Sequence, residues 1–237
     1  MSIIDMLFPS QVKCLNCGVE TSKLAICDKC IKNLTIIPPP TCAICGGEIS
    51  GKGKVCIECK GREFAFARNY SIFVYADMVR KMIIDFKQNG HKAIGEMFAY
   101  FIEDKCDDIL VKNNIDIIIP VPISEERLKE RKFNQSEVLC SRLLLTNKVD
   151  VNALIRVKPT PHQTGLSRSN REENLKDAFV VTDKKNIKGK TVLLVDDIYT
   201  TGSTLNACSK ILKNSGAKEV ITLTLARVPI RKESVVD

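Results

Sequence analysis

The chain has 237 residues, a mass of 26.4 kDa and a formal charge of +8, and 44% of its residues are hydrophobic. This composition is that of a folded globular protein and argues against global disorder. No apolar run reaches the roughly 18–20 residues of a membrane-spanning helix, and residues 1–8 carry neither the basic start nor the cleavage site of a signal peptide. We therefore expect a cytoplasmic protein with no membrane partner.

Cysteine is concentrated at the N-terminal end of the chain. A Cys-x-x-Cys turn places two sulfurs on one side of a tight loop, and two such turns complete a tetrahedral zinc site. We expect two closed, structural Zn²⁺ sites; sequential pairing of the turns is the simplest, and the spacing leaves a crossed pairing open. Eight of the eleven cysteines form four such turns: Cys14/Cys17, Cys27/Cys30, Cys42/Cys45 and Cys56/Cys59.

Two other uses of these cysteines are disfavoured. A disulfide framework is typical of secreted domains, and no signal peptide is visible. A redox-active dithiol would need only one such motif. The remaining cysteines, Cys106, Cys140 and Cys208, lie in expected helices among apolar neighbours, so we expect them to pack in the core.

The segment that carries the zinc turns is expected to be a module of its own. It is poor in large apolar side chains and would hardly fold without metal. The proline run 38–40 is a stiff spacer between its two zinc units. We expect a double zinc-ribbon module over residues 1–62 and a second domain over residues 63–237.

Zinc binding changes the charge argument. Eight thiolates (−8) and two Zn²⁺ (+4) would lower the net charge from +8 to +4, so the basic pI is weak evidence for nucleic-acid binding. Residues 1–62 hold eight basic and five acidic side chains, and the same correction brings the module near −1. We therefore expect the ribbons to act first as a structural or protein-docking module.

From residue 70 onward, the pattern alternates between strands and helices. The expected strands are 70–75, 115–119, 153–157, 178–181, 191–195 and 220–225. A helix capped by Asp77 ends at Asn89-Gly90, a second helix runs through 94–109, Asn134 and Glu137 form a capping box before a third helix, and a fourth spans about 203–214. This alternation predicts an α/β fold, a parallel sheet with helices on both faces.

Residues 192–204 are the most informative segment. A buried strand ends in two carboxylates, Asp196 and Asp197, which can accept hydrogen bonds from a vicinal diol. A loop then opens directly into a helix, whose N–H groups and dipole favour an anion. Together these features predict a ribose 5-phosphate site at the carboxyl end of the sheet; no Walker sequence is present. The loop consists of Thr200, Thr201, Gly202, Ser203 and Thr204.

This run resembles the phosphoribosyl-pyrophosphate (PRPP) motif of type I phosphoribosyltransferases, and almost the whole chain resembles the ComF (competence protein F) family. One departure is Lys132, which stands where the family usually has glycine. The features shared with that family are the cysteine-rich N-terminal double zinc ribbon, Phe86-Lys87, residues 119–122, residues 131–135, Gln163, Arg171 with Asn174, and the PRPP motif.

The resemblance implies a type I phosphoribosyltransferase-like fold and a PRPP-binding protein needed for DNA uptake in natural transformation. It implies transfer of a 5-phosphoribosyl group from PRPP to an unknown nitrogen acceptor, with Mg²⁺ on the pyrophosphate in addition to the two Zn²⁺. A DNA-uptake helicase or another competence protein is an implied partner. Two alternatives stay open: a PRPP sensor without turnover, and a module that binds single-stranded DNA.

The resemblance also implies roles for residues. Asp196 and Asp197 would hold the ribose hydroxyls and, with Arg171, form the catalytic set, while residues 200–204 would hold the 5-phosphate. The polar segment 158–174 would form a lid. The pyrophosphate loop and lid would be Pro120, Val121, Pro122, Arg127, Arg131, Lys132, Gln163, Arg168 and Asn174.

The conformation of Lys132 is a separate expectation. Since Asn134 should cap the next helix, the residues before it should be extended. We therefore expect an ordinary backbone at Lys132, a solvated side chain, and little change in thermal stability when Lys132 is replaced by glycine.

Overall fold

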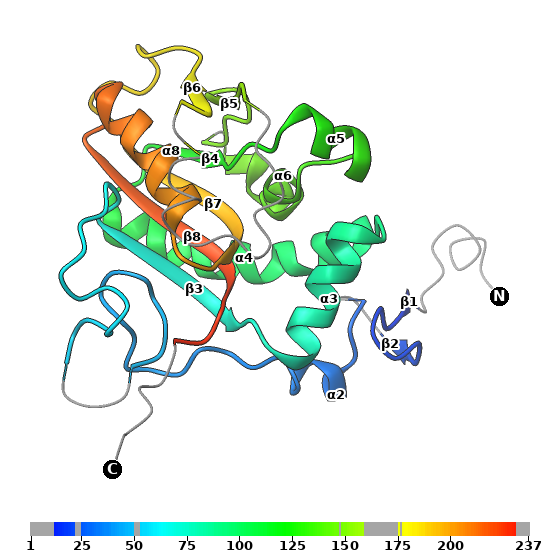
Figure 1. Ribbon diagram of the computed structural model, residues 1–237. Helices are drawn as coiled ribbons and strands as arrows, with labels where there is room; N and C mark the ends of the chain where they lie inside the picture. Colours follow the sequence, from blue (N-terminus) through cyan, green and yellow to red (C-terminus); the bar gives the residue numbers. More distant parts are fainter. Residues whose placement is uncertain are drawn as a thin grey trace.

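Runs rich in Ile, Val and Leu form a four-stranded sheet at the centre of the protein (Figure 1). The structure is a computed structural model that describes residues 12–21, 25–49, 53–146, 148–158, 175 and 177–230. The sheet order is β3-β8-β7-β4, and all neighbours are parallel. The strands are β3 (Arg68–Val74), β4 (Ile117–Pro120), β7 (Thr191–Tyr199) and β8 (Glu219–Arg227).

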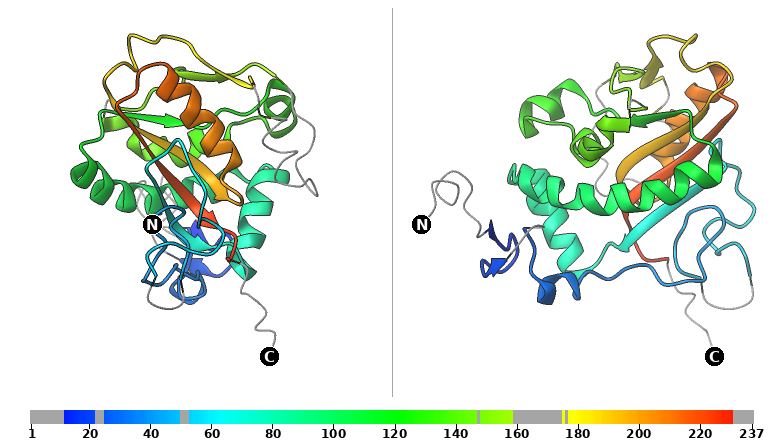
Figure 2. Two further views of the ribbon diagram at one scale, coloured as in Figure 1. Left: turned by 60° about the vertical axis from the view of Figure 1, so that its left-hand side comes forward. Right: turned by 180° about the vertical axis from the view of Figure 1, so that it is seen from behind.

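Helices cover both faces of this sheet, as Figures 1 and 2 show. One face packs against α3 (Asp77–Gln88), α4 (Lys92–Asn113) and α6 (Gln135–Leu139). The other face packs against α8 (Ser203–Asn214). Two hydrophobic cores therefore lie on opposite sides of the strands, which confirms the predicted α/β class.

Two short strands lie outside the parallel sheet. The segments β5 (Leu154–Arg156) and β6 (Phe179–Val181) were both expected as strands, and they pair with each other in antiparallel fashion. Each strand is three residues long, and together they form a separate two-stranded sheet. The short helix α5 (Glu125–Arg131) and the 3₁₀ helix η1 (Ser141–Thr146) complete this side.

Most element boundaries differ from the expectations by one to a few residues. The residue preceding α3 is Ala76, so the prediction of Asp77 as its cap is wrong; Asp77 is the first helical residue, with φ of 43°. The third helix ends at Leu139 and continues as η1. Strand β7 runs on to Tyr199, so the acid pair lies within the strand. By contrast, α8 spans the expected residues 203–214.

The N-terminal segment packs along the edge of the sheet. It contains the strand pair β1 (Val12–Lys13) and β2 (Glu20–Thr21) and the short helix α2 (Asp28–Ile31). Its linker and second ribbon bond to edge strand β3, through Ile37 N to Ile72 O at 2.9 Å and Asn69 N to Ile44 O at 2.7 Å. These bonds cover backbone groups that an edge strand would otherwise expose.

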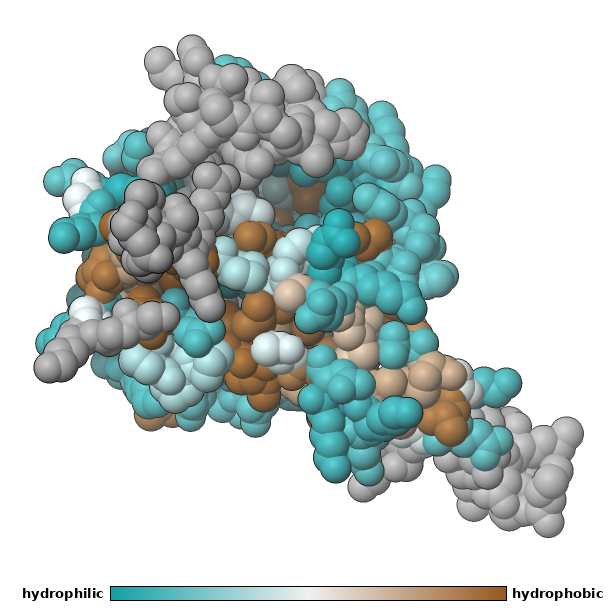
Figure 3. All heavy atoms as spheres, turned by 60° about the horizontal axis from the view of Figure 1, so that its bottom comes forward, coloured by the Kyte–Doolittle hydropathy of each residue, from teal (hydrophilic) through white to brown (hydrophobic). Residues whose placement is uncertain are grey.

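Apolar side chains reach the surface on the side of the molecule where the linker lies (Figure 3). Among the exposed apolar residues are Ile36 of the linker and Ile57 of the second ribbon, at 63% and 52% exposure. None of the helices in the described ranges is both long and apolar enough to cross a bilayer.

Candidate functional site

A cavity of about 170 Å³ lies at the carboxyl ends of β4 and β7. The register pairs Pro120 with Val195, and the amide of Val121 donates to the carbonyl of Val195 at 2.9 Å. This pairing brings the turn after β4 next to the acid pair of β7. Val121, Pro122, Arg127, Arg131, Asp196, Asp197, Thr200 and Thr204, all expected site residues, line the cavity.

The two carboxylates of the site have different partners. The Asp196 carboxylate accepts hydrogen bonds from the Ser136 hydroxyl at 3.2 Å and from the backbone amide of Asp197 at 2.9 Å. The Asp197 carboxylate pairs with the ammonium of Lys87, at 2.8 Å. Lys87 comes from the last turn of α3, so this helix carries a cation to the cavity.

The environment of Asp196 disfavours its charge. Removal from water and the negative charge of Asp197 raise its pKa from 3.8 to about 7, while the Lys87 ammonium acts in the opposite direction. A carboxyl that titrates near neutrality within a cluster of charges is typical of functional sites.

Cations outnumber acids around the cavity. Lys87 and three arginines face two carboxylates, which leaves a formal excess of two positive charges. Burial and the nearby charge of Arg127 lower the pKa values of both Arg131 and Arg156. Crowding of half-buried cations raises the free energy of the site, so this side of the cavity suits a highly charged phosphate group.

A hydrogen bond to Gln135 orients one of these arginines, Arg131. Arg131 Nη1 donates to Gln135 Oε1 at 2.9 Å, while the buried Nε2 of Gln135 has no hydrogen-bond partner among the described residues. Asn134 anchors the same segment: its side chain accepts from the amide of Ser136 at 3.0 Å and donates to the carbonyl of Val121 and to Glu137, both at 3.1 Å. Asn134 therefore caps α6, as predicted, but Glu137 bonds to its side chain and not to its backbone amide as in a capping box. The bond to Val121 also ties α6 to the turn after β4.

The loop between β7 and α8 closes the opposite side of the cavity. Gly202, with φ of 77°, precedes the first turn of α8. A Cβ atom there would lie 2.4 Å from the Tyr199 hydroxyl, so only glycine fits both the backbone and the space. Thr201 and Ser203 share a 2.8 Å hydroxyl contact. Thr200 and Thr204 border the cavity, and the three residues between them complete the loop.

Lys132 departs from its expected conformation. It ends α5 with φ of 70° and ψ of −5°, in the left-handed region, so the expectation of an ordinary backbone is wrong. Its amide donates to the carbonyl of Leu128 at 2.8 Å, which is the geometry of a helix end that usually carries glycine. Its side chain is exposed and is not part of the cavity lining, as expected for a solvated lysine.

Other expected residues have different outcomes. Pro120 is buried at the end of β4, behind the cavity. The expected lid residues Gln163, Arg168, Arg171 and Asn174 lie outside the described residues.

Four polar lining residues had no role assigned from sequence: Lys87, Gln135, Ser136 and Arg156. Lys87 and Gln135 stand in segments that resemble the ComF family, and Arg156 lies within the expected strand 153–157. These sequence features could have pointed to those residues, whereas no such feature of the sequence marks Ser136.

The eight N-terminal cysteines form two separate clusters. Within each cluster, the four Sγ atoms all lie within 4.8 Å of one another. Four converging thiol groups suit a tetrahedral Zn²⁺, and the grouping confirms sequential pairing. The first centre is Cys14, Cys17, Cys27 and Cys30, and the second is Cys42, Cys45, Cys56 and Cys59.

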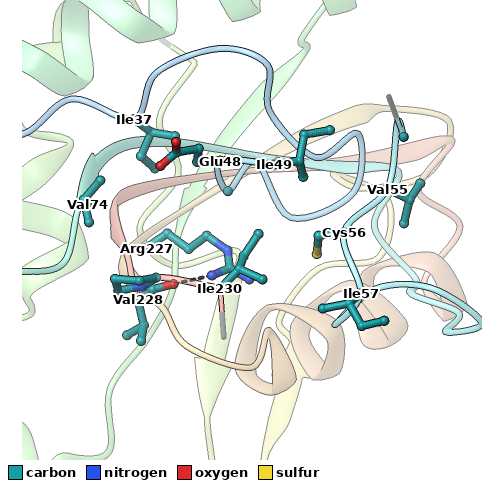
Figure 4. A pocket seen from close by; sticks show the side chains of 13 residues that line it. Ile37, Glu48, Ile49, Val55, Cys56, Ile57, Val74, Arg227, Val228 and Ile230 are labelled. Atoms are coloured by element: carbon teal, nitrogen blue, oxygen red, sulfur yellow. Dashed lines mark hydrogen bonds between the residues drawn. The ribbon is translucent and has the colours of Figure 1, made fainter. Parts of the chain in front are cut away.

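A larger cavity, of about 500 Å³, lies between the second zinc centre and the end of β8 (Figure 4). Its lining is mostly aliphatic, and its arginine, Arg227, is already paired with Glu58. The smaller cavity, with its excess of cations and a loop that opens into a helix, therefore suits a phosphate group better despite its size.

The fold and two family matches define the class of this protein. Residues 142–237 match a phosphoribosyl transferase domain, and residues 3–60 match a double zinc ribbon domain. A solved hypoxanthine phosphoribosyl transferase from Trypanosoma cruzi aligns over 61% of this chain and 76% of that one, with a TM-score of 0.35 and 16% identity. The two family matches, together with the parallel sheet, make the chain a phosphoribosyltransferase-fold protein with an N-terminal double zinc ribbon.

Similar proteins identify the family within this class. Competence protein F of Haemophilus influenzae is 32% identical over 225 residues, which cover 91% of this chain and 96% of that protein. Competence protein ComFC of Bacillus subtilis is 27% identical over 209 residues, 85% and 84% of the two chains. The chain belongs to the competence protein F family.

Proposed function

We propose that this protein binds PRPP with Mg²⁺ in the 170 Å³ cavity and transfers its 5-phosphoribosyl group to a nitrogen nucleophile, releasing pyrophosphate. The observation that carries this proposal is the division of the cavity: an acid pair lies between a cation-rich side and a helix-opening loop. A ribose that carries phosphate groups at both ends has the matching arrangement of charge.

Each part of the cavity has a role in this proposal. Asp196 and Asp197 accept hydrogen bonds from the ribose 2- and 3-hydroxyls. Amides and hydroxyls of residues 200–204 donate to the 5-phosphate. Arg127, Arg131 and Arg156 stabilise the pyrophosphate, and we further propose that Arg171 joins them from the lid. Lys87 positions the Asp197 carboxylate through their 2.8 Å ion pair.

The carboxylates also suit Mg²⁺, which prefers oxygen ligands. The metal would neutralise charge that develops on the departing pyrophosphate. In the reaction itself, a nitrogen lone pair forms a bond to C1 of the ribose as the bond from C1 to the pyrophosphate oxygen breaks, and that oxygen keeps the electron pair. The arginines stabilise the charge on the leaving group.

The biological setting follows from the relatives. Their names connect them with competence, so we propose that this protein acts in DNA uptake, in the cytoplasm, together with other competence proteins such as a helicase. We also propose that residues 1–62 form the docking module and residues 63–237 the PRPP-binding domain. Contact with single-stranded DNA would add a salt-dependent partner.

Calorimetry with PRPP and Mg²⁺, on the protein and on Asp196→Asn/Asp197→Asn, tests the proposal. Loss of two charge-assisted hydrogen-bond acceptors should weaken binding by more than about tenfold, at roughly 1.5–3 kcal/mol each. The matched control is Asp107→Asn/Asp108→Asn, an exposed adjacent pair on α4. Unchanged affinity in the first variant would refute the ribose role.

Turnover is measured separately, as pyrophosphate release in the presence of candidate nitrogen acceptors. Release that depends on both PRPP and an acceptor supports the transferase. Tight PRPP binding without release under all acceptors would instead favour a PRPP sensor that acts through partners.

A further inference from the structure

The second zinc centre is joined to the sheet by one buried arginine. Arg227, the last residue of β8, is only 2% exposed. Its Nε donates to the Sγ of Cys45 at 3.3 Å, its Nη2 pairs with Glu58 at 2.7 Å, and its Nη1 donates to the carbonyl of Val228. Figure 4 shows the side chain extended across the cavity toward the ribbon that carries Cys56. Arg227 thus contacts the zinc ligand Cys45 and also Glu58, which lies between the ligands Cys56 and Cys59.

The same arginine reaches the proposed 5-phosphate loop, residues 200–204 (the phosphate loop), through Tyr199. Its guanidinium carbon lies 5.3 Å from the centroid of the Tyr199 ring, and the carbonyl of Tyr199 accepts from the amide of Val228 at 3.0 Å. The Tyr199 hydroxyl in turn lies against Gly202, where a Cβ would come within 2.4 Å. The ring therefore stands between the second zinc centre and the loop.

A second connection begins at Glu58. Its carbonyl accepts from Arg62 Nη1 at 2.8 Å, and Arg62 Nη2 donates to the carbonyl of Thr201 at 3.2 Å. Close by, the amide of Ala65 donates to Asn206 Oδ1, in the first turns of α8, at 2.8 Å. Residues just after Cys59 therefore hold both the phosphate loop and the start of the helix that follows it.

We infer that the second zinc centre positions the 5-phosphate loop, with Glu58, Arg62 and Arg227 as the positioning residues. This inference rests on the proposed function. The Cys56-x-x-Cys59 turn fixes Glu58, whose carboxylate and carbonyl hold the two arginines. Zinc at this centre then supports binding of a ribose 5-phosphate group as well as the fold of the ribbon.

The first zinc centre has a different environment. Cys14 and Cys30 belong to the core on the α3 and α4 face, whereas all four cysteines of the second centre belong to the core on the α8 face. Only the second centre is therefore expected to act on the loop that opens α8.

The test uses Glu58→Gln and Arg62→Ala in the full-length, zinc-loaded protein, with all eight zinc ligands intact. Binding of PRPP, ribose 5-phosphate and magnesium pyrophosphate is measured by calorimetry, and zinc by elemental analysis. We expect both variants to bind PRPP and ribose 5-phosphate about fivefold more weakly, within the range for coupling through packed networks. Pyrophosphate, which does not contact the loop, should bind within about twofold of the wild-type affinity.

The matched control is Glu103→Gln. Glu103 also pairs with an arginine, Arg142, and its side chain is 33% exposed against 30% for Glu58, but it lies on α4. It should leave all three affinities unchanged.

Wild-type protein that binds neither PRPP nor ribose 5-phosphate would refute the proposed function itself. If the wild type binds them, equal weakening of all three ligands, or unchanged ribose 5-phosphate binding in both variants, would overturn only the positioning role. Should Glu58→Gln lose zinc, normal ribose 5-phosphate binding by that variant would overturn the role as well.

Discussion

At the scale of single residues, Asp196 connects the charge of the site with the stability of the fold. Its pKa is raised to about 7 because its carboxyl is removed from water and lies beside Asp197. In the unfolded chain, the same group titrates near 3.8. Between these pH values the folded protein holds a proton that the unfolded chain releases, so the stability contribution of Asp196 falls as the pH rises from about 4 through 7.

This pKa predicts a pH-dependent gain from Asp196→Asn. The ligand-free variant should melt at a higher temperature than the wild type at pH 8, and the difference should shrink as the pH falls to 5. Thermal melts at four pH values measure it, and the comparison removes the contributions of other groups. In Asp107→Asn the difference should be small and flat; a flat difference in Asp196→Asn would contradict the raised pKa.

Lys132 gives a second prediction at this scale. A non-glycine residue in the left-handed region costs roughly 1 kcal/mol, so Lys132→Gly should stabilise the protein by about 0.5–1 kcal/mol, or a few degrees in melting temperature. PRPP affinity should change little, since the side chain is outside the cavity lining.

Lys129→Gly provides a control of opposite sign for this change. Lys129 is exposed within the same helix, α5, and glycine there should destabilise by about 1 kcal/mol. A fall in melting temperature for Lys132→Gly would show that its positive φ is not strained.

At the scale of elements, sequence patterns predicted the features that depend on residues close together in the chain. The bounds of α8 follow from a glycine before its first turn and a loop at its end. Asn134 and Glu137, which contact each other, are only three residues apart in the sequence. The antiparallel pairing of β5 with β6 could not be predicted, because short apolar strands do not specify their partner. The positive φ at Lys132 gave no signal, because lysine has no preference for that region.

Long-range contacts were also invisible in the sequence. Arg227 lies 182 positions from Cys45 and 169 from Glu58, yet it contacts both. The long-range contact of Arg227 also explains Gly47. A Cβ at this position would lie 2.6 Å from Arg227 Nε, so the glycine leaves room for the arginine side chain. Only the folded arrangement explains that glycine, whereas the acid pair and residues 200–204 are contiguous in the sequence, so their grouping could be predicted directly.

The loop before α8 gives the prediction for this scale. Gly202→Ala should destabilise the protein by about 1–2 kcal/mol, through its positive φ and the close contact with Tyr199. It should also weaken PRPP binding, because the loop must shift. Melting temperature and calorimetry measure the two effects.

The Gly189→Ala variant distinguishes the effect of backbone strain from the effect of the contact between residue 202 and Tyr199. Gly189 has the same φ, 77°, but a Cβ there would meet nothing within 4 Å. This variant should lose stability alone, while PRPP affinity stays at the wild-type value. Equal PRPP affinity in both variants would contradict the role of the loop.

At the scale of the whole molecule, the two zinc centres belong to cores on opposite faces of the sheet. They differ in access to solvent. Cys17 of the first centre is exposed, whereas all four cysteines of the second are buried. Metal loss from the second centre therefore requires opening of the core on the α8 face, and metal loss from the first does not.

The eleven cysteines should consequently react in three groups. Purified protein should hold two zinc per chain and, with a chelator and a thiol reagent, release zinc in two steps of four thiols each, the first centre reacting faster. The last three thiols, Cys106, Cys140 and Cys208, should react only after unfolding. They are buried, and burial raises the pKa of each, that of Cys106 to about 12.

Zinc release and thiol modification are followed together in one absorbance experiment. Cys17→Ser should abolish the fast release of zinc and reduce the fast thiols from four to three. The slow step should stay unchanged, because the second centre keeps its four ligands in a separate core. A single step that releases eight thiols would mean that the centres open together, and reaction of Cys140 in the folded protein would contradict its burial. Two separated steps would establish that one centre can lose its metal while the centre beside the phosphate loop keeps its own.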